Sequence, residues 1–152
     1  MEEFKVGQLT KEMVVTRLKA LGDPCAAAAD VAKKTLVIAL KSIGPSPGTG
    51  AGRVVGEVCY GAMVGLLLTE QNLPKGATLI LEKVAEAASE LNLDPTEALT
   101  WALRGIADTR KLLDLGQVRE IAEAIKRAFD GAGEAFMAMI EEDEAKTRPA
   151  GG

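Results

Sequence analysis

Histidine is absent from this chain of 152 residues, and aromatic residues are scarce, with one tryptophan, one tyrosine and three phenylalanines. The lack of histidine excludes His-dependent catalytic triads and His-ligated metal sites. It also excludes the common di-iron helical bundle, whose Glu-x-x-His motifs ligate the metal. These absences weigh against an enzyme without excluding one, and they predict neither a cofactor nor a metal. The core must be built from Ala, Leu, Val, Ile and Met, which suits closely packed helices.

Cysteine is nearly absent too, because the chain has only Cys25 and Cys59. Two cysteines are too few for a disulfide framework or a tetrahedral Cys site. The first residues are polar and acidic, which is not the pattern of a signal peptide. The apolar run Val58–Leu68 has eleven residues, whereas a membrane-spanning helix needs about 20. These features predict a cytoplasmic protein without a membrane span.

Positive charge is in short supply as well, with a net charge of −4 and no stripe of Lys or Arg. Tight binding to nucleic acid needs many cations that neutralise phosphates. Platforms for single strands also need stacking aromatic side chains, which are few here. We therefore expect no nucleic-acid partner.

Glycine, in contrast, is plentiful, and seven of the sixteen glycines lie between Gly44 and Gly65. Glycine weakens an isolated helix by roughly 1 kcal/mol relative to alanine, so its benefit here is space. A helix without side chains on one stripe lets another backbone come close. Two such small-residue spacings occur, Gly52/Gly56 and Gly61/Gly65, and they predict close helix packing.

Helical periodicity predicts an all-α, single-domain bundle of five to six helices, and alternating strand patterns are absent. The helices are expected over residues 10–22, 24–43, 52–71, 76–91, 95–113 and 117–142. The second and third are the most apolar, so we expect them to form a central Gly-rich helical hairpin. The domain is expected to cover residues 1–142, followed by a disordered acidic tail over 143–152 that ends in glycine.

Capping signals set these boundaries. Thr10 is the expected N-cap of the first helix. Asp23 and Asp94 each precede a proline, which places an N-cap directly before a proline at the first helical position. The last helix has the cleanest apolar period, although Gly131 and Gly133 weaken its continuity.

The Gly44–Arg53 segment is a candidate anion-binding loop, with Gly48, Gly50, Gly52 and Arg53 as its possible ligands. Backbone N–H groups at a helix start can hold a phosphate, with the arginine as counter-charge. However, a helix precedes the loop where the dinucleotide fingerprint needs a strand, and the Lys-Ser/Thr pair of a P-loop is missing. A connector between two apolar helices is therefore the preferred interpretation.

Cys25 falls in the first turn of the second predicted helix, where a helix N-terminus lowers the pKa of a thiol. Asp23 beside it opposes that effect, and no base is evident nearby. We interpret Cys25 as a small, partly buried residue, and its reactivity stays open. Cys59, in the apolar third helix, is interpreted as a core residue.

Trp101 lies off the main apolar stripe of its helix, so it either covers a second surface or edges the core. Together with Gly56, Gly61 and Gly65, it is our candidate for a subunit interface.

Two segments, residues 36–43 and 54–68, are apolar on more sides than a small bundle easily covers. A symmetric partner would cover the remainder, because two-fold dimers are the commonest soluble oligomers. The favoured function is thus a non-catalytic helical interaction or assembly protein that forms a homodimer. A bundle that encloses a small apolar, lipid-like ligand is the alternative. A phosphate-substrate enzyme that uses the Gly44–Arg53 loop is a further alternative.

Overall fold

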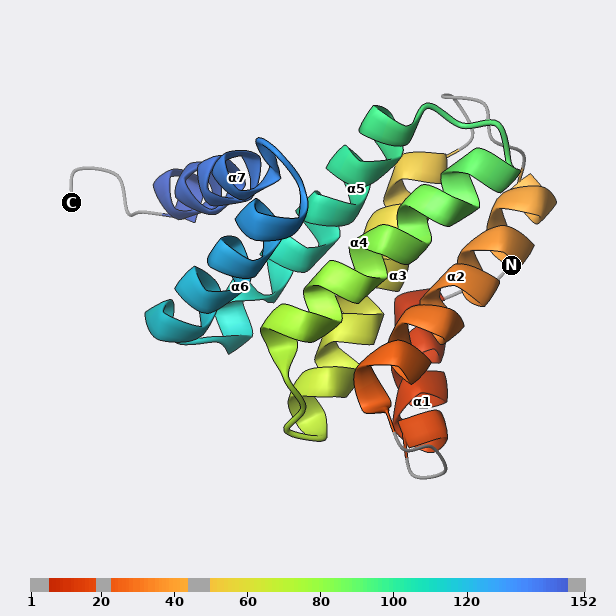
Figure 1. Ribbon diagram of the computed structural model, residues 1–152, viewed down its shortest axis with the longest axis horizontal. Helices are drawn as coiled ribbons and strands as arrows, with labels where there is room; N and C mark the ends of the chain where they lie inside the picture. The colour runs from red at the N-terminus through yellow and green to blue at the C-terminus, as the bar shows by residue number, and fades with distance from the viewer. Residues whose placement is uncertain (1–5, 19–22, 44–49, 148–152) are drawn as a thin grey trace.

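The computed structural model describes residues 6–18, 23–43 and 50–147 of the chain (Figure 1). These ranges contain no strand, which confirms the all-α bundle. Seven α-helices and one 3₁₀ helix are described: α1 Val6–Leu18, α2 Pro24–Ile43, α3 Ala51–Leu68, α4 Leu73–Glu90, α5 Pro95–Ala107, η2 Asp108–Leu112, α6 Leu115–Ala128 and α7 Ala132–Thr147.

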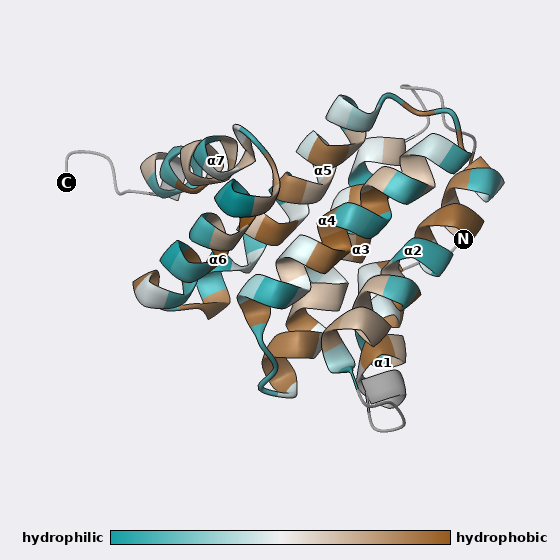
Figure 2. Cartoon of the chain, in the orientation of Figure 1, coloured by the Kyte–Doolittle hydropathy of each residue, from teal (hydrophilic) through white to brown (hydrophobic). Residues whose placement is uncertain are grey.

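Helix α3 is the centre of the bundle. It packs against α1, α2, α4 and α5, while α6 packs on α4, and α7 packs on α5 and α6. Figure 1 shows α3 behind α4, with α1 and α2 on one side of it and α5 on the other. The hydrophobic residues in Figure 2 run along α3, whereas α6 turns hydrophilic residues outward. The apolar side chains of residues 54–68 therefore serve mainly to bury α3 among its four neighbours.

Among the described residues, α3 is the one helix that is long and apolar enough to cross a membrane, by length and composition alone. Half of this helix is buried inside the bundle. The core helix of a soluble protein passes the same test, so the finding is weak evidence for a membrane span.

The glycines of α3 let neighbouring backbones touch it. A Cβ atom on Gly61 would collide with the carbonyl oxygen of Gly7 in α1, and a Cβ on Gly105 in α5 would collide with that of Gly56. A Cβ on Gly65 would lie 2.8 Å from Cγ1 of Val14. Close packing at these spacings is thus confirmed, and the partners are α1 and α5. The predicted hairpin of α2 and α3 stays a prediction, because residues 44–49 lie outside the described part.

Two of the predicted caps are confirmed. The Asp23 carboxylate accepts a hydrogen bond from the backbone N–H of Ala26 at 3.2 Å, and that of Asp94 accepts one from Thr96 at 2.9 Å. Each aspartate satisfies a backbone donor that has no partner within the helix.

The predicted start of the first helix is wrong, because α1 begins at Val6 and not after Thr10. Thr10 is buried, and its hydroxyl donates to the carbonyl oxygen of Val6 at 2.7 Å. Threonine inside a helix can bond back to the carbonyl four residues earlier, so this residue type alone does not distinguish a cap from an interior position. The predicted end at residue 22 lies outside the described residues.

The last predicted helix is two helices, α6 and α7. Between them Gly131 has a φ of +77°, a left-handed conformation that glycine adopts at little cost. The apolar period continues across the break, since Phe136 and Ile140 are buried like Ile121 and Ile125. The apolar periodicity of the sequence therefore does not reveal the turn between α6 and α7.

Helix α7 continues to Thr147, past the expected domain end at residue 142. Asp143 lies on this extension, and its Oδ1 is 3.6 Å from Nη1 of Arg104 in α5. This ion pair gives the added turn a partner in the bundle. Residues 148–152 of the predicted tail lie outside the described part.

Candidate functional site

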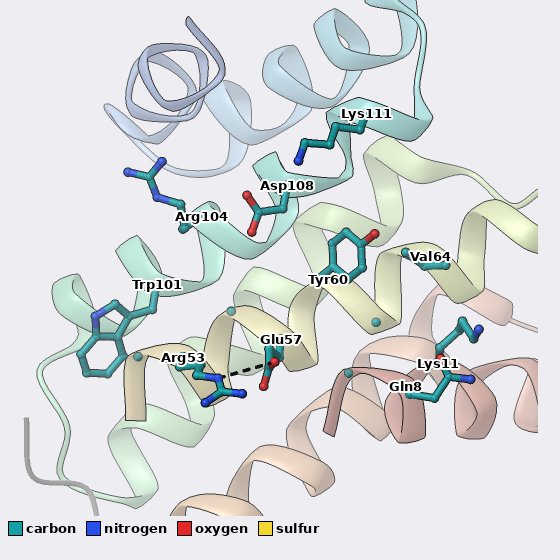
Figure 3. Close-up of a pocket in the computed structure, with 14 residues that line it drawn as sticks. Gln8, Lys11, Arg53, Glu57, Tyr60, Val64, Trp101, Arg104, Asp108 and Lys111 are labelled. Atoms are coloured by element: carbon teal, nitrogen blue, oxygen red, sulfur yellow. Dashed lines mark ion pairs between the residues drawn. The ribbon is translucent and has the colours of Figure 1, made fainter. Parts of the chain in front are cut away.

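A cleft of about 1090 Å³ opens between α1, α3 and the α5–η2 segment (Figure 3). Three stripes of side chains at helical spacing converge on it. They are Gly7, Gln8 and Lys11 from α1; Gly52, Arg53, Gly56, Glu57, Tyr60, Gly61 and Val64 from α3; and Trp101, Arg104, Asp108 and Lys111 from α5–η2. The glycine contacts of α3 with α1 and α5 therefore position the walls of the cleft.

The cleft is cationic although the chain is acidic. Four basic residues, Lys11, Arg53, Arg104 and Lys111, face two acidic residues, so the cleft carries a net charge of four minus two, or +2. The whole chain has a net charge of −4. Positive charge is therefore concentrated here.

The two arginines of the cleft already have carboxylate partners. Nε of Arg53 lies 3.7 Å from Oε1 of Glu57. Arg104 reaches away from the cleft toward α7, where it lies 3.9 Å from Glu142 and 3.6 Å from Asp143. The Arg53–Glu57 and Arg104–Glu142 contacts are exposed, so they contribute little to stability. Lys11 and Lys111 form no ion pair with a described residue, but the charge of Lys111 acts on the Asp108 carboxylate in the same cleft.

Asp108 is the acidic residue between these walls. Desolvation by the surrounding chain raises the pKa of its carboxyl above the usual value, and the negative charge of Asp143 adds to the rise. The positive charges of Arg104, Lys111 and Arg110 offset part of it. The ionised form of Asp108 is therefore disfavoured by its surroundings.

Trp101 forms one end of the cleft. A Cβ on Gly52 would lie 2.7 Å from Nε1 of the indole and 2.8 Å from its Cε2. The edge of the ring thus rests on the α3 backbone, where any larger residue would displace it. Figure 3 shows Trp101 at this end, Lys11 at the opposite end, and Tyr60 and Lys111 between them.

A second hollow, an apolar groove of about 590 Å³, lies between α1, α2 and the start of α3. Ile38 on α2 is 69% exposed beside it. Leu9, Met13 and Ile43 also line the groove and are exposed to a smaller degree. The groove contains a buried polar atom as well, because Oγ1 of Thr35 makes no hydrogen bond with a described residue.

The predicted anion-binding residues lie at the start of α3, between the two hollows. Gly52 lines the cleft, Gly50 lines the groove, where it caps α3 with a φ of +86°, and Arg53 lines both. Gly48 lies outside the described residues. The anion-binding hypothesis for the whole loop stays a prediction, although two of its residues face the cationic cleft.

The predicted interface residues face neighbours within the chain. Gly61 and Gly65 contact α1, and Gly56 contacts α5. Trp101 is partly buried against Gly52. Their role in a subunit contact stays a prediction. Ile38 and Ile43 of the apolar groove are exposed and belong to the 36–43 segment, which the sequence marked as apolar on too many sides.

Neither cysteine is placed for nucleophilic chemistry. Burial raises the pKa of the Cys25 thiol, and the charge of Asp23 adds to this effect, while Lys75 opposes it. The thiol donates to the carbonyl oxygen of Asn72 at 3.4 Å. Burial raises the pKa of Cys59 to about 12. Both thiols are therefore protonated near neutral pH, and thiolates are the reactive form.

The described residues contain no group of three or more potential ligands that could hold a metal ion. No protein-family model, curated protein or solved structure matches this chain.

Proposed function

We propose that the protein is a non-catalytic assembly protein that forms a homodimer through the apolar groove between α1 and α2. The observation that carries this proposal is the gathering of exposed apolar side chains in one place. Among the described residues, seven large hydrophobic side chains are exposed, and four of them line the groove. Contiguous exposed apolar surface of this kind marks interaction sites on proteins.

The shape of the groove supports a second copy of the chain as its occupant. A two-fold interface brings the same patch of both copies face to face, so the patch needs a protrusion beside a hollow. Ile38 is the protrusion, at 69% exposed, and the groove of about 590 Å³ is the hollow. In the proposed dimer, Ile38 of each copy enters the groove of the other.

The charges around the groove support the same occupant. Lys34, Arg53 and Glu57 line it together with the apolar residues. Glu57 lies near Arg53 of its own chain, and we expect Lys34 or Arg53 of a second copy to approach it, because charge complementarity favours a defined register over random apolar contact. The proposal also takes α2 and α3 as the arms of the Gly-rich hairpin, since these helices are in contact and both line the groove.

The test is the mass of the protein in solution, measured by light scattering during size exclusion. The wild type is expected at twice the chain mass of 15.9 kDa. Ile38→Glu is expected at the chain mass, because a carboxylate without a partner is costly to bury in an apolar contact.

The matched control is Leu68→Glu, which places the same charge at a residue that is 62% exposed but outside the groove. This variant should remain dimeric. A wild type that stays at the chain mass at every concentration contradicts the proposal, and so does an Ile38→Glu protein that remains dimeric.

A second candidate is a binding site for an apolar ligand with one polar group. The groove volume lies within the range of about 300–1,000 Å³ that small-molecule sites occupy. The Thr35 hydroxyl, buried and without a partner among the described residues, would receive the polar group. Saturable 1:1 binding of the fluorescent fatty acid parinaric acid, weakened by Thr35→Val, would favour this candidate over the dimer.

A further inference from the structure

One hydroxyl group in the apolar groove has no hydrogen-bond partner. Thr35 lies on α2 and lines the groove, it is 7% exposed, and its Oγ1 makes no hydrogen bond with a described residue. A buried polar group of this kind lowers stability unless something bonds to it. Because the described residues supply no partner, a polar group from another molecule would remove this cost.

The other threonines show that the arrangement of Thr35 is unusual. A threonine hydroxyl inside a helix can donate to a carbonyl oxygen one turn earlier, and it then needs no other partner. Thr35 could donate in this way to Val31 but does not. Five threonines of the described part do bond back to the preceding turn, at 2.6–3.1 Å: Thr10, Thr69, Thr78, Thr100 and Thr109.

The proposed dimer does not account for the Thr35 hydroxyl. Ile38 is the residue that would enter the groove of the other copy, and its side chain has no polar atom. The dimer would therefore cover Thr35 without giving it a hydrogen bond. The unpartnered hydroxyl points to another occupant of the groove, one that carries a polar group.

The shape and lining of the groove indicate the class of this occupant. Apolar side chains from α1, α2 and α3 form most of the lining, and they suit a hydrocarbon chain. The volume of about 590 Å³ lies within the range of about 300–1,000 Å³ for small-molecule sites. Along α2 the groove extends from Lys34 to Ile43, a length of roughly 14 Å at 1.5 Å per residue. An extended chain matches this length.

The charged residues of the groove favour a carboxylate as the polar group. Lys34 and Arg53 are basic and Glu57 is acidic, so the groove has one positive charge in excess. Nε of Arg53 lies 3.7 Å from Oε1 of Glu57, whereas Lys34 makes no ion pair with a described residue. Lys34 is the neighbour of Thr35 in α2. A carboxylate that accepts a hydrogen bond from Thr35 therefore gains the attraction of the lysine as well.

We propose that a long-chain carboxylate, such as a fatty acid, binds in the groove with its carboxylate on Thr35 and thereby releases the dimer. The inference rests on the proposed dimer, because the hydrocarbon chain and Ile38 of the second copy need the same apolar surface. The ligand binds the open groove of the monomer and not the covered groove of the dimer. It therefore shifts the equilibrium toward the monomer.

The test is the mass of the protein, measured by light scattering during size exclusion at increasing concentrations of decanoate. The wild type is expected at twice the chain mass of 15.9 kDa without decanoate and at the chain mass with it. Acetate has the carboxylate without the chain, and decanol has the chain without the charge. Each should need a concentration about tenfold or more higher for the same effect. Release by acetate at the decanoate concentration contradicts a role for the apolar groove.

The decisive variant is Thr35→Val, which replaces the hydroxyl by a methyl group of similar size. It is expected to remain dimeric without ligand and to need about tenfold or more decanoate for release, because a hydrogen bond to a charged group is lost. The matched control is Thr78→Val, outside the groove, where the hydroxyl already bonds to Pro74. This control should respond like the wild type. Equal release of the two variants contradicts the site, because decanoate would then act only as a detergent.

A second variant tests the charge of the ligand. Lys34→Gln should raise the concentration of decanoate needed for release and leave that of decanol unchanged, because only decanoate carries a negative charge. The comparison of the two ligands within one variant removes any effect of Lys34 on the dimer itself. An equal change for both ligands contradicts the carboxylate assignment.

The dimer and its release fail in different ways. A wild type at the chain mass before any ligand is added contradicts the dimer, and its release with it. A dimer that keeps its mass while parinaric acid emission shows saturated binding contradicts the release alone.

Discussion

The cleft and the groove share α1 as a wall, yet the two hollows differ in chemistry. Helix α1 presents Gln8 and Lys11 to the cleft, and Leu9 and Met13 to the groove. Successive residues of a helix point about 100° apart, so neighbours in the sequence serve opposite flanks. The thirteen residues of α1 therefore divide a cationic site from an apolar one.

The difference between the two hollows follows from the glycine contact between α1 and α3. Helix α1 approaches α3 through backbone, at Gly7 and Gly61, where neither helix carries a side chain. A narrow contact of this kind leaves the flanks of α1 open to line two hollows. A helix that contacted α3 through large side chains would fill that space.

The largest loss of stability is expected when the packing of α1, the wall that both hollows share, is disturbed. Gly61→Ala is expected to lower the free energy of unfolding by roughly 1–3 kcal/mol, because the new Cβ overlaps the Gly7 carbonyl oxygen and both are fixed by helices. The control Gly56→Ala adds a Cβ 3.5 Å from the carbonyl oxygen of Trp101, an ordinary contact. Urea midpoints compare the two variants, and equal midpoints would mean that the Gly7–Gly61 contact does not position α1.

A smaller loss of stability is expected for a substitution at Gly131, in the turn between α6 and α7, away from both hollows. Gly131→Ala should cost about 1–2 kcal/mol, because this residue has a φ of +77° and nothing crowds it. The sequence, which placed Gly131 inside a helix, predicts the opposite, a slight stabilisation. A urea midpoint above that of the wild type would support the sequence and contradict the turn. The dimer mass should stay unchanged.

Gly52→Ala should alter one hollow and spare the other. The Cβ would lie 2.7 Å from Nε1 of Trp101 and would displace the indole. We expect a changed tryptophan emission spectrum. The dimer mass should not change, since Gly52 does not line the groove. An unchanged spectrum would mean that the indole does not rest on Gly52.

The smallest effect on stability is expected for Asp108→Asn. The pKa of Asp108 is raised mainly by desolvation, so the folded chain holds this proton more tightly than the unfolded chain does. Its contribution to stability therefore falls as the pH rises above the usual carboxyl pKa of about 3.9. Asp108→Asn should have a slightly higher urea midpoint than the wild type at neutral pH, with the difference vanishing in acid. A lower midpoint at neutral pH would contradict this sign.

The fold class could be predicted from sequence because its signals are local. Apolar periodicity and the aspartate–proline pairs at Asp23 and Asp94 act within one helix, and both caps form as expected. The break at Gly131 was missed because the apolar period runs through it. Thr10 was misplaced because a threonine hydroxyl makes similar bonds at a cap and inside a helix.

The cleft could be predicted only in part, because its stripes come from three helices far apart in the chain. Gly52, Arg53 and Trp101 stood out by composition or position, and all three line the cleft. Nothing local distinguishes Lys11 or Lys111 from other surface lysines. They line the same cleft only when Gly61 brings α1 against α3, and the sequence does not show which backbone a glycine stripe will meet.

The proposed dimer is tested most directly by the mass of Ile38→Glu, measured by light scattering during size exclusion, together with the emission spectrum of Trp101. Ile38 lines the groove and not the cleft, and Trp101 lines the cleft and not the groove. We expect the mass to be half that of the wild type and the emission spectrum to be unchanged. A variant that keeps the wild-type mass would contradict the assignment of the groove as the interface between two copies.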